Sequence, residues 1–474
     1  MEVHPKSWLW EGFSVKLDGI TNVYGSTKLF NCNRKAEEVL VAATDSNEKA
    51  LENCFRIVRF DRADNLRGTA PTVELPGLTE FQSSFTVLAV HSIPKKDVNL
   101  ICVIFINQVE EDPENESLDQ KCCINIYSAP SVDDAASTPV DYVEQVVTFN
   151  PTNVTDAFLG TPEDDQNVFL IPCENSDVHI FRNCSTDQLF KFSELSHDES
   201  QKLFPEFQFD RRFLEQVDQP LPLIMWLDVM YVPFAEHKRL SAIAWENGNI
   251  QLALTSITTS QENTTESPPI AVELLFAKVI CFDGPVTQLR FFTSKAVDLG
   301  NTEINLVVCT ALEFVYVYHD VVNSSFSKVV PFDDSSIEAD CVLCCAVYDI
   351  DMDCQNEIVI GTFYQQIAAF KFSPVKNIYE LMWERKYPGP VRALEVVDLS
   401  NDGVHDLIVV TNNSVHIMQH NIAYIAQICK QNLLAFVKRL ETGGETTPPP
   451  VGGLNKGEDD SLNATAYLHK EASN

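Results

Sequence analysis

The sequence is poor in positive charge and has no long apolar run. Lys and Arg number 34 against 68 Asp and Glu in 474 residues, a formal net charge of −34. So acidic a surface repels phosphate groups, which argues against binding to nucleic acids or anionic lipids. No stretch reaches the roughly 18–20 apolar residues of a membrane-spanning helix, and residues 1–10 contain no apolar segment of signal-peptide length. We therefore expect a cytoplasmic protein that is not inserted in membranes and whose partners are basic proteins or cations.

The motifs of the common enzyme classes are also absent. The chain has no phosphate-binding glycine loop, no H-E-x-x-H and no G-x-S-x-G. One C-x-x-C, Cys341 to Cys344, lies in an apolar run without the second ligand pair that zinc requires. Cysteine in such a run is typical of a buried, reduced thiol. The sequence therefore predicts a protein that is not an enzyme.

Helical periodicity is scarce before residue 421, and short apolar runs in pairs take its place. Each pair consists of two strand-like segments joined by polar residues, which predicts a β-hairpin; the Asn247-Gly248 turn is the strongest such signal. Seven pairs recur: 39–43 with 55–60, 101–106 with 123–127, 168–171 with 178–181, 240–245 with 250–254, 306–309 with 314–318, 358–360 with 367–372, and 407–410 with 415–418.

The later hairpins are each preceded by a further apolar run, so that the repeating unit approaches four strands. Asp298, Asp349 and Asp398 lie 51 and 49 residues apart, a spacing typical of propeller blades of about 40–50 residues. WD dipeptides and GH pairs are missing, and with only 5 Trp and 17 Gly the blades must close on Val, Ile, Phe and Cys. We predict an all-β, seven-bladed β-propeller over residues 1–420.

Beyond the propeller the apolar period changes to three or four residues. This period predicts one amphipathic helix over residues 421–441, followed by a Pro- and Gly-rich disordered tail over 442–474. The apolar face of this helix packs either on the last blade or against a partner subunit. Six residues of this face are therefore candidates for partner binding: Ile422, Ile425, Cys429, Leu433, Phe436 and Leu440. Two polar insertions, 108–120 and 258–269, are predicted to be exposed.

Two related acidic segments carry the most chemical signal. Both place oxygen-bearing groups at positions 1, 3, 5, 7 and 9, as calcium-binding loops do. Position 6 favours Gly because the chain turns there with positive φ; Gly403 satisfies this, whereas Cys354 does not. Weak calcium binding and simple Asp-capped turns are both compatible with these segments. The candidate ligands are Asp349, Asp351, Asp353, Gln355 and Glu357 in the first loop, and Asp398, Ser400, Asp402, Val404 and Asp406 in the second.

These loops resemble the FG-GAP repeats of integrin α-subunit propellers, whose hairpins follow D-x-D-x-D-G calcium loops. From residue 21 to about 440 the chain also resembles the kaptin family, in an ordered set of individually weak motifs. These motifs are at 21–25, 203–206, 226–229 with 239–242, 283–285, 342–344, 349–357, 362–364, 397–407 and 415–420. Cys354 departs from the family's loop glycine, which weakens the calcium prediction.

The resemblance implies a non-enzymatic scaffold subunit of the KICSTOR complex. Its partners would be a second FG-GAP-type propeller subunit and a large scaffold subunit, and indirectly the GATOR complex. The complex would recruit GATOR to the lysosomal membrane and restrain TOR complex one under amino-acid or glucose deprivation. The alternative is direct binding to actin filaments in lamellipodia and other actin-rich projections, which the net charge disfavours because filaments are also acidic.

Overall fold

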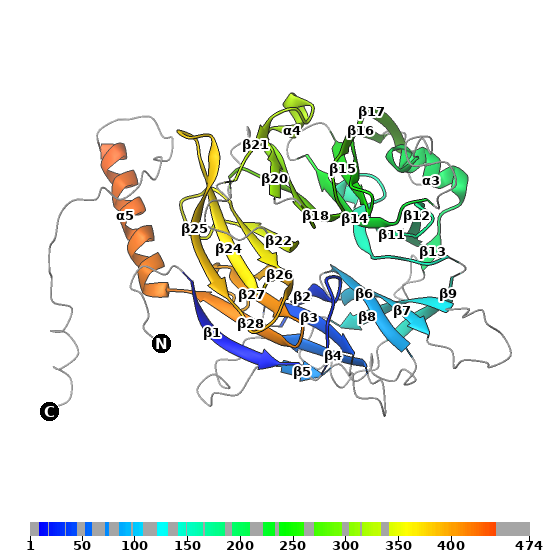
Figure 1. Ribbon diagram of the computed structural model, residues 1–474, viewed down its shortest axis with the longest axis horizontal. Coiled ribbons are helices and arrows are strands. Elements are labelled where there is room, and N and C mark those ends of the chain that lie inside the picture. The colour runs from blue at the N-terminus through cyan, green and yellow to red at the C-terminus, as the bar shows by residue number, and fades with distance from the viewer. Residues whose placement is uncertain are drawn as a thin grey trace. The chain divides into compact units, whose positions relative to one another are not determined.

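The computed structural model confirms the all-β propeller. It describes residues 9–17, 19–33, 35–44, 53–58, 72–74, 85–95, 98–107, 121–130, 141–147, 149–164, 166–184, 192–208, 221–232, 237–259, 270–295, 303–312, 315–332 and 341–441. Within them the strands form seven four-stranded antiparallel sheets (Figure 1). The insertion at 108–120, most of that at 258–269, and the predicted tail at 442–474 lie outside these residues.

The first four blades follow the chain from residue 26. Blade 1 contains β2 (Ser26–Asn31), β3 (Ala36–Thr44), β4 (Asn53–Val58) and β5 (Thr72–Glu74). Blade 2 contains β6 (Phe85–Pro94), β7 (Val98–Asn107), β8 (Lys121–Pro130) and β9 (Asp141–Val146). Blade 3 contains β10 (Thr155–Phe158), β11 (Asn167–Pro172), β12 (Val178–Asn183) and β13 (Phe192–Glu194). Blade 4 contains β14 (Ile224–Tyr231), β15 (Lys238–Trp245), β16 (Asn249–Thr259) and β17 (Ile270–Cys281).

The last three blades include one strand from the start of the chain. Blade 5 contains β18 (Val286–Thr293), β19 (Ile304–Thr310), β20 (Val315–Tyr318) and β21 (Val329–Val330). Blade 6 contains β22 (Val342–Tyr348), β23 (Glu357–Thr362), β24 (Gln366–Ser373) and β25 (Ile378–Lys386). Blade 7 contains β26 (Val391–Val397), β27 (Asp406–Thr411), β28 (Ser414–His420) and β1 (Leu9–Lys16).

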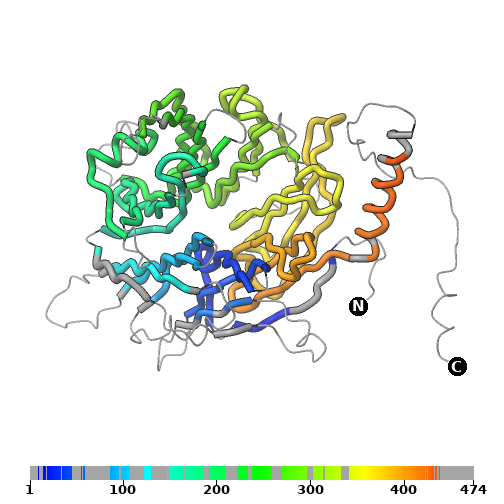
Figure 2. The backbone as a smooth tube through the Cα atoms, turned by 180° about the vertical axis from the view of Figure 1, so that it is seen from behind, coloured from blue at the N-terminus to red at the C-terminus, as the bar shows by residue number. Residues whose placement is uncertain are grey.

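The ring closes through β1, which pairs antiparallel with β28 from Leu9 opposite His420 to Lys16 opposite Ser414. Figures 1 and 2 both show this N-terminal strand beside the strands of blade 7. Because the outer strand of the last blade comes from the other end of the chain, separating blades 1 and 7 requires breaking a β-ladder. β1 is thus the strand that closes the ring.

Each of the seven predicted hairpins forms the middle pair of strands in one blade. Val168, for example, lies opposite Arg182 in β11 and β12, and the Asn247-Gly248 turn joins β15 to β16 with Gly248 at φ 84°. The seven hydrophobic clusters correspond to the seven interfaces between neighbouring blades, including the one between blades 7 and 1. Burial between sheets, rather than within one, therefore holds the ring together.

Few helices are found in the described residues. Two short α-helices, α3 (His197–Leu203) and α4 (Val321–Ser324), and two 3₁₀ turns, η2 (Pro162–Asp164) and η3 (Pro205–Phe207), lie in connections of the propeller. α5 (Ile422–Glu441) is the predicted C-terminal helix. The chain divides into two compact units, 1–421 and 422–474, so α5 belongs to the second.

Candidate functional site

The two acidic loops occupy the same position in neighbouring blades. Residues 349–356 connect β22 to β23 in blade 6, and residues 398–405 connect β26 to β27 in blade 7. Each loop joins the innermost strand to the next strand and ends on a carboxylate, Glu357 or Asp406, that is buried at the start of the second strand. The sequence repeat is therefore also a structural repeat.

The backbone geometry of the two loops is nearly identical. Asp349 accepts hydrogen bonds from the amides of Asp353 (3.0 Å) and Cys354 (2.8 Å), as Asp398 does from Asp402 (3.2 Å) and Gly403 (2.9 Å). Positions 4 and 6 are left-handed in both: φ is 60° and 69° in the first loop, 53° and 82° in the second. Cys354 thus adopts the conformation that favours Gly, at a cost of about 1 kcal/mol.

The position 7 residues are held by the position 5 carboxylates. The Gln355 amide donates to Asp353 Oδ1 (2.9 Å) and its side-chain Nε2 to Asp353 Oδ2 (3.2 Å), while the Val404 amide donates to Asp402 Oδ1 (2.9 Å). These bonds are Asx-type turns, which stabilise a loop without a metal ion.

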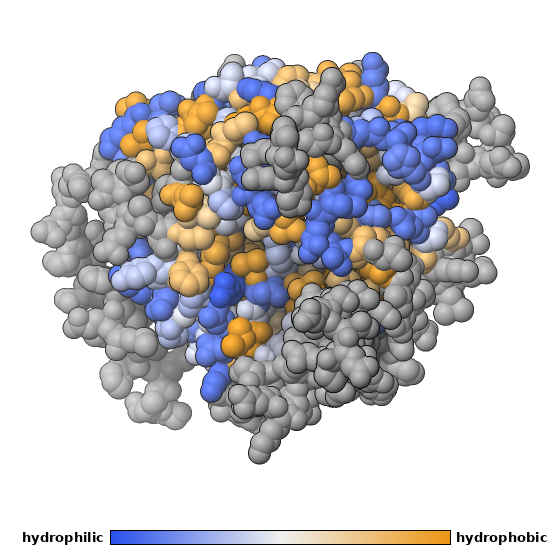
Figure 3. All heavy atoms as spheres, turned by 45° about the vertical axis from the view of Figure 1, so that its right-hand side comes forward, coloured by the Kyte–Doolittle hydropathy of each residue, from blue (hydrophilic) through white to orange (hydrophobic). Residues whose placement is uncertain are grey.

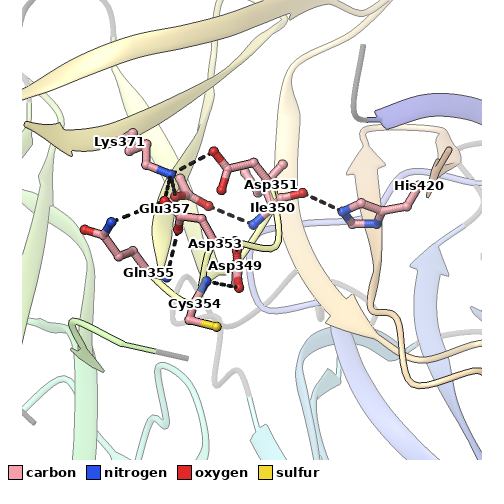
Figure 4. A network of polar contacts seen from close by, with 9 residues as sticks. All are labelled: Asp349, Ile350, Asp351, Asp353, Cys354, Gln355, Glu357, Lys371 and His420. Carbon is pink, nitrogen blue, oxygen red and sulfur yellow. Dashed lines mark hydrogen bonds and ion pairs between the residues drawn. The ribbon is translucent and has the colours of Figure 1, made fainter. Parts of the chain in front are cut away.

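The first loop gathers four carboxylates, and an ammonium group of the chain itself contacts three of them (Figure 4). One oxygen atom from each of Asp349, Asp351, Asp353 and Glu357 lies within 4.8 Å of the others. Lys371 Nζ, from β24, lies 2.7 Å from Asp351, 2.6 Å from Asp353 and 3.0 Å from Glu357. A calcium ion at this point would require the same oxygens, so it would have to displace Lys371.

The second loop has a neutral residue where the first has Lys371. Lys371 comes one residue after Phe370, which pairs with Ile358, and Gln419 comes one residue after Met418, which pairs with Leu407. Position 3 differs as well, Asp351 against Ser400. Four carboxylates with one ammonium and three carboxylates with none both give a formal charge of −3. The two differences thus compensate one another.

Burial shifts the titration of these groups. Desolvation, reinforced by the Asp351 charge, raises the pKa of Glu357 to about 8. Desolvation also raises the pKa of Asp406 to about 7, with Asp402 and Asp398 adding to it, and that of Asp349 to about 6. The carboxylates around Lys371 outweigh its own desolvation and raise the pKa of its ammonium. At neutral pH the lysine is therefore a fixed cation.

A histidine of blade 7 contacts the blade 6 loop across the blade interface. His420, at the end of β28, is buried, and its Nε2 lies 2.9 Å from the carbonyl oxygen of Ile350 in the blade 6 loop. Burial lowers the pKa of His420, so a neutral imidazole fits this contact. The pattern of residues gave no indication of this long-range contact.

The predicted binding face of α5 is partly described. Ile425 is 8% exposed and Leu433 is 63% exposed, while Cys429 is also exposed. Leu434 and Val437, which the prediction did not include, are exposed too. The side chains of Ile422, Phe436 and Leu440 lie outside the described ones. Apolar side chains thus remain accessible on this helix.

The propeller also contains cavities and a buried ion pair away from the two loops. A cavity of about 360 Å³ on the axis is lined by the inner strands and includes the charged side chains of Asp228, Arg290 and Glu395. A second, of about 530 Å³, lies beside β12 and α3. Next to it, Arg239 Nε is 2.7 Å from Glu206 Oε1, with both side chains fully buried. No local sequence pattern indicates this pair, because its members are 33 residues apart.

The C-x-x-C of the sequence lies at the start of β22 in blade 6. Cys344 and Cys345 are buried, Cys341 is half-buried, and none of the cysteines that the structure describes forms a disulfide. In the described part of the chain no helix has the length and apolar character needed to cross a bilayer.

Comparison with known proteins gives matches over most of the propeller. Residues 12–430 match the family model of the KICSTOR complex protein kaptin. A curated relative, the KICSTOR complex protein kaptin of Mus musculus, is 25% identical over 315 residues. That alignment covers 64% of this chain and 66% of the relative, slightly under two thirds of its length.

Two solved structures align with most of this chain. They are crystal structures of BBS1N in complex with ARL6DN, soaked with lead and with mercury. Their TM-scores are 0.48 and 0.47 at 12% and 11% identity, and each alignment covers 87% of this chain and 97% of the other.

Proposed function

The chain belongs to the kaptin family, and we propose that it is a non-enzymatic interaction subunit of the KICSTOR complex. The observation that carries the proposal is the family match over residues 12–430, which spans the propeller from β1 to β28 and reaches into α5. A closed ring of seven sheets offers two faces of loops on a rigid body, which suits a protein that holds other polypeptides. The finer role is to help recruit the GATOR complex to lysosomes and restrain TOR complex one when amino acids or glucose are scarce.

The proposed partners are a second FG-GAP-type propeller subunit and a large scaffold subunit. The accessible Leu433, Leu434 and Val437 of α5 support a contact there, because an apolar helix face gains free energy when a groove covers it. The protein would be cytoplasmic and would reach the lysosomal surface through the complex.

Affinity purification at native expression, with mass spectrometry of the bound proteins, tests this function. We expect the other KICSTOR subunits to be recovered and the chain's abundance to fall when one of them is depleted. Deletion of residues 421–474 tests α5 separately: loss of the partners with an unchanged melting temperature supports its role in binding. Unchanged partners with a lower melting temperature would show instead that α5 stabilises the chain.

Direct binding to actin filaments is the alternative function. Cosedimentation of the purified protein with filaments decides it, because a KICSTOR subunit without actin affinity stays in the supernatant. A net charge of −34 opposes association with an acidic filament, and added salt screens this repulsion, so any binding should become stronger as salt is added.

For the cofactor, we propose that blade 6 needs none, because the Lys371 ammonium already contacts the carboxylate oxygens that calcium would bind. If the chain binds calcium, the loop at 398–406 is the better candidate. It has Gly403 at position 6 and Gln419 in place of the lysine, and Asp406 Oδ2 is buried without a hydrogen-bond partner. Such an oxygen gains free energy from a cation.

A further inference from the structure

We propose that the turn joining β23 to β24 in blade 6, with the basic side chains beside it, is a docking surface for an acidic and apolar segment of a partner protein. We call Phe363, Tyr364, Lys386 and Arg392 the blade 6 tip. The inference rests on the proposed function as a complex subunit, and it names a surface and a chemistry that this function leaves open.

The two aromatic rings at the tip are unusually accessible for their size. Phe363 is 53% exposed and Tyr364 is 56% exposed, and they are consecutive in the turn. Leu312, 73% exposed, occupies the equivalent turn of blade 5, between β19 and β20. In Figure 3 apolar side chains are interspersed with hydrophilic ones over the face shown. Paired exposed aromatics are typical of the anchors of protein interfaces.

The turn that carries these rings is held firmly on both sides. The Phe363 amide donates to the carbonyl of Cys341, before β22, at 2.9 Å. The Gln365 carbonyl accepts from the amide of Tyr387, after β25, at 2.6 Å. The rings are therefore presented on a fixed backbone, so binding does not have to order this turn.

Positive charge gathers at the tip of an otherwise acidic protein. The Arg392 guanidinium lies 5.9 Å from the centre of the Phe363 ring, and Lys386 Nζ lies 5.4 Å from that of Tyr364. Arg392, which comes from β26 of the neighbouring blade 7, also donates to Asn412 of that same blade, which fixes its orientation. Glu384 is a nearby carboxylate, and it accepts a hydrogen bond from Gln366 at 2.7 Å.

Charge complementarity selects the occupant. Cations beside aromatic rings suit a segment in which Asp or Glu flanks an apolar side chain: the apolar group covers the rings and the carboxylates reach Arg392 and Lys386. An anionic lipid surface has similar chemistry, but the net charge of −34 repels an extended anionic surface much more than a short segment.

The test uses the full chain co-expressed with the other KICSTOR subunits. The variants Phe363→Ser with Tyr364→Ser, and Lys386→Glu with Arg392→Glu, should each weaken assembly at least tenfold while the melting temperature is kept. Val375→Ser is the matched control, because Val375 is 94% exposed in the same blade but at the opposite end of β24. It should leave assembly unchanged. A photo-crosslinker at residue 363 should then join an acidic segment of another subunit, and reversing that segment's charge should rescue the charge-reversed variant.

The outcomes distinguish a failure of the docking surface from a failure of the proposed KICSTOR function. If the unmodified chain does not assemble, the function and the docking surface both fail. If it assembles and both tip variants assemble equally well, only the docking surface fails. Crosslinking within the chain or to a basic segment overturns it too, and so does tip-dependent binding to phosphatidylserine-containing vesicles.

Discussion

Replacing Lys371 by Gln gives blade 6 the residue that blade 7 has at this position, and it should destabilise the protein. The change leaves Asp351, Asp353 and Glu357 without the ammonium that lies 2.6–3.0 Å from them. Removing one partner of a fully buried ion pair costs about 3–5 kcal/mol. The Lys371 side chain is 25% exposed, so we expect a smaller loss of unfolding free energy, about 2–3 kcal/mol.

The second substitution, Asp351→Ser, should restore most of that loss. With both changes the loop has the −3 formal charge of the blade 7 loop, and stability should return to within about 1 kcal/mol of the unmodified protein. Urea unfolding of the two single variants and the double variant measures the coupling between the two side chains. Lys376→Gln is the control, since this lysine pairs with Glu380 on the surface and should contribute under about 0.5 kcal/mol. A loss from Lys371→Gln no larger than the control's would refute the reasoning.

Calcium provides an independent readout of the same idea. With Lys371 in place, the blade 6 loop should add no response of the protein's melting temperature to calcium or chelator. In the Lys371→Gln variant, calcium should raise the melting temperature, because the carboxylate oxygens are then free to bind it. Asp402→Ala, tested alongside, removes any contribution from the second loop. If calcium stabilises the unmodified protein as much as it stabilises Lys371→Gln, the Lys371 ammonium does not take the place of a calcium ion.

Three further predictions concern stability. Cys354→Gly should stabilise the protein by about 1 kcal/mol, because Gly adopts the left-handed backbone of this position without strain. Gly403→Ala should destabilise it by about the same amount, because the space around Gly403 is open and only the left-handed backbone is unfavourable for Ala. Melting temperatures that shift in the same direction in both variants would contradict this. The pKa of Glu357 is about 8 in the folded protein, above its value in the unfolded chain, so between these two pKa values the folded state binds one more proton. The free energy of unfolding should therefore fall as pH rises from about 4.5 to 8, by at most about 1.4 kcal/mol per pH unit. Glu357→Gln should flatten that profile. Arg239→Met should lose about 3–5 kcal/mol by leaving Glu206 buried and unpaired, and adding Glu206→Met should recover most of it; an equally unstable double variant would show that packing, not charge, sets the loss.

The propeller could be predicted because its signals are local. Each middle hairpin combines two apolar runs with one turn, and both runs lie within about 30 residues, so period and turn residues suffice. The closing strand was harder to assign: Leu9–Lys16 pairs with His420 and its neighbours at the other end of the chain. Local sequence patterns do not show that strands from the two ends of the chain pair with one another. The same distance problem hid Arg239 with Glu206, and His420 with Ile350.

The acidic loops show where spacing stops being informative. Oxygen atoms at positions 1, 3, 5, 7 and 9 of the loop can bind either a metal ion or a positively charged side chain. The loop sequence contains only the negative groups, so it does not show which of the two cations is bound. The positive partner, Lys371, lies on the far strand of the hairpin, opposite Glu357 only once the β23–β24 register is known. That register can be counted back from the turn at 363–365, and the same count in blade 7 reaches Gln419. An acidic loop before a hairpin should therefore be interpreted together with the residue its register places opposite position 9, since that residue decides whether the loop still needs a cation.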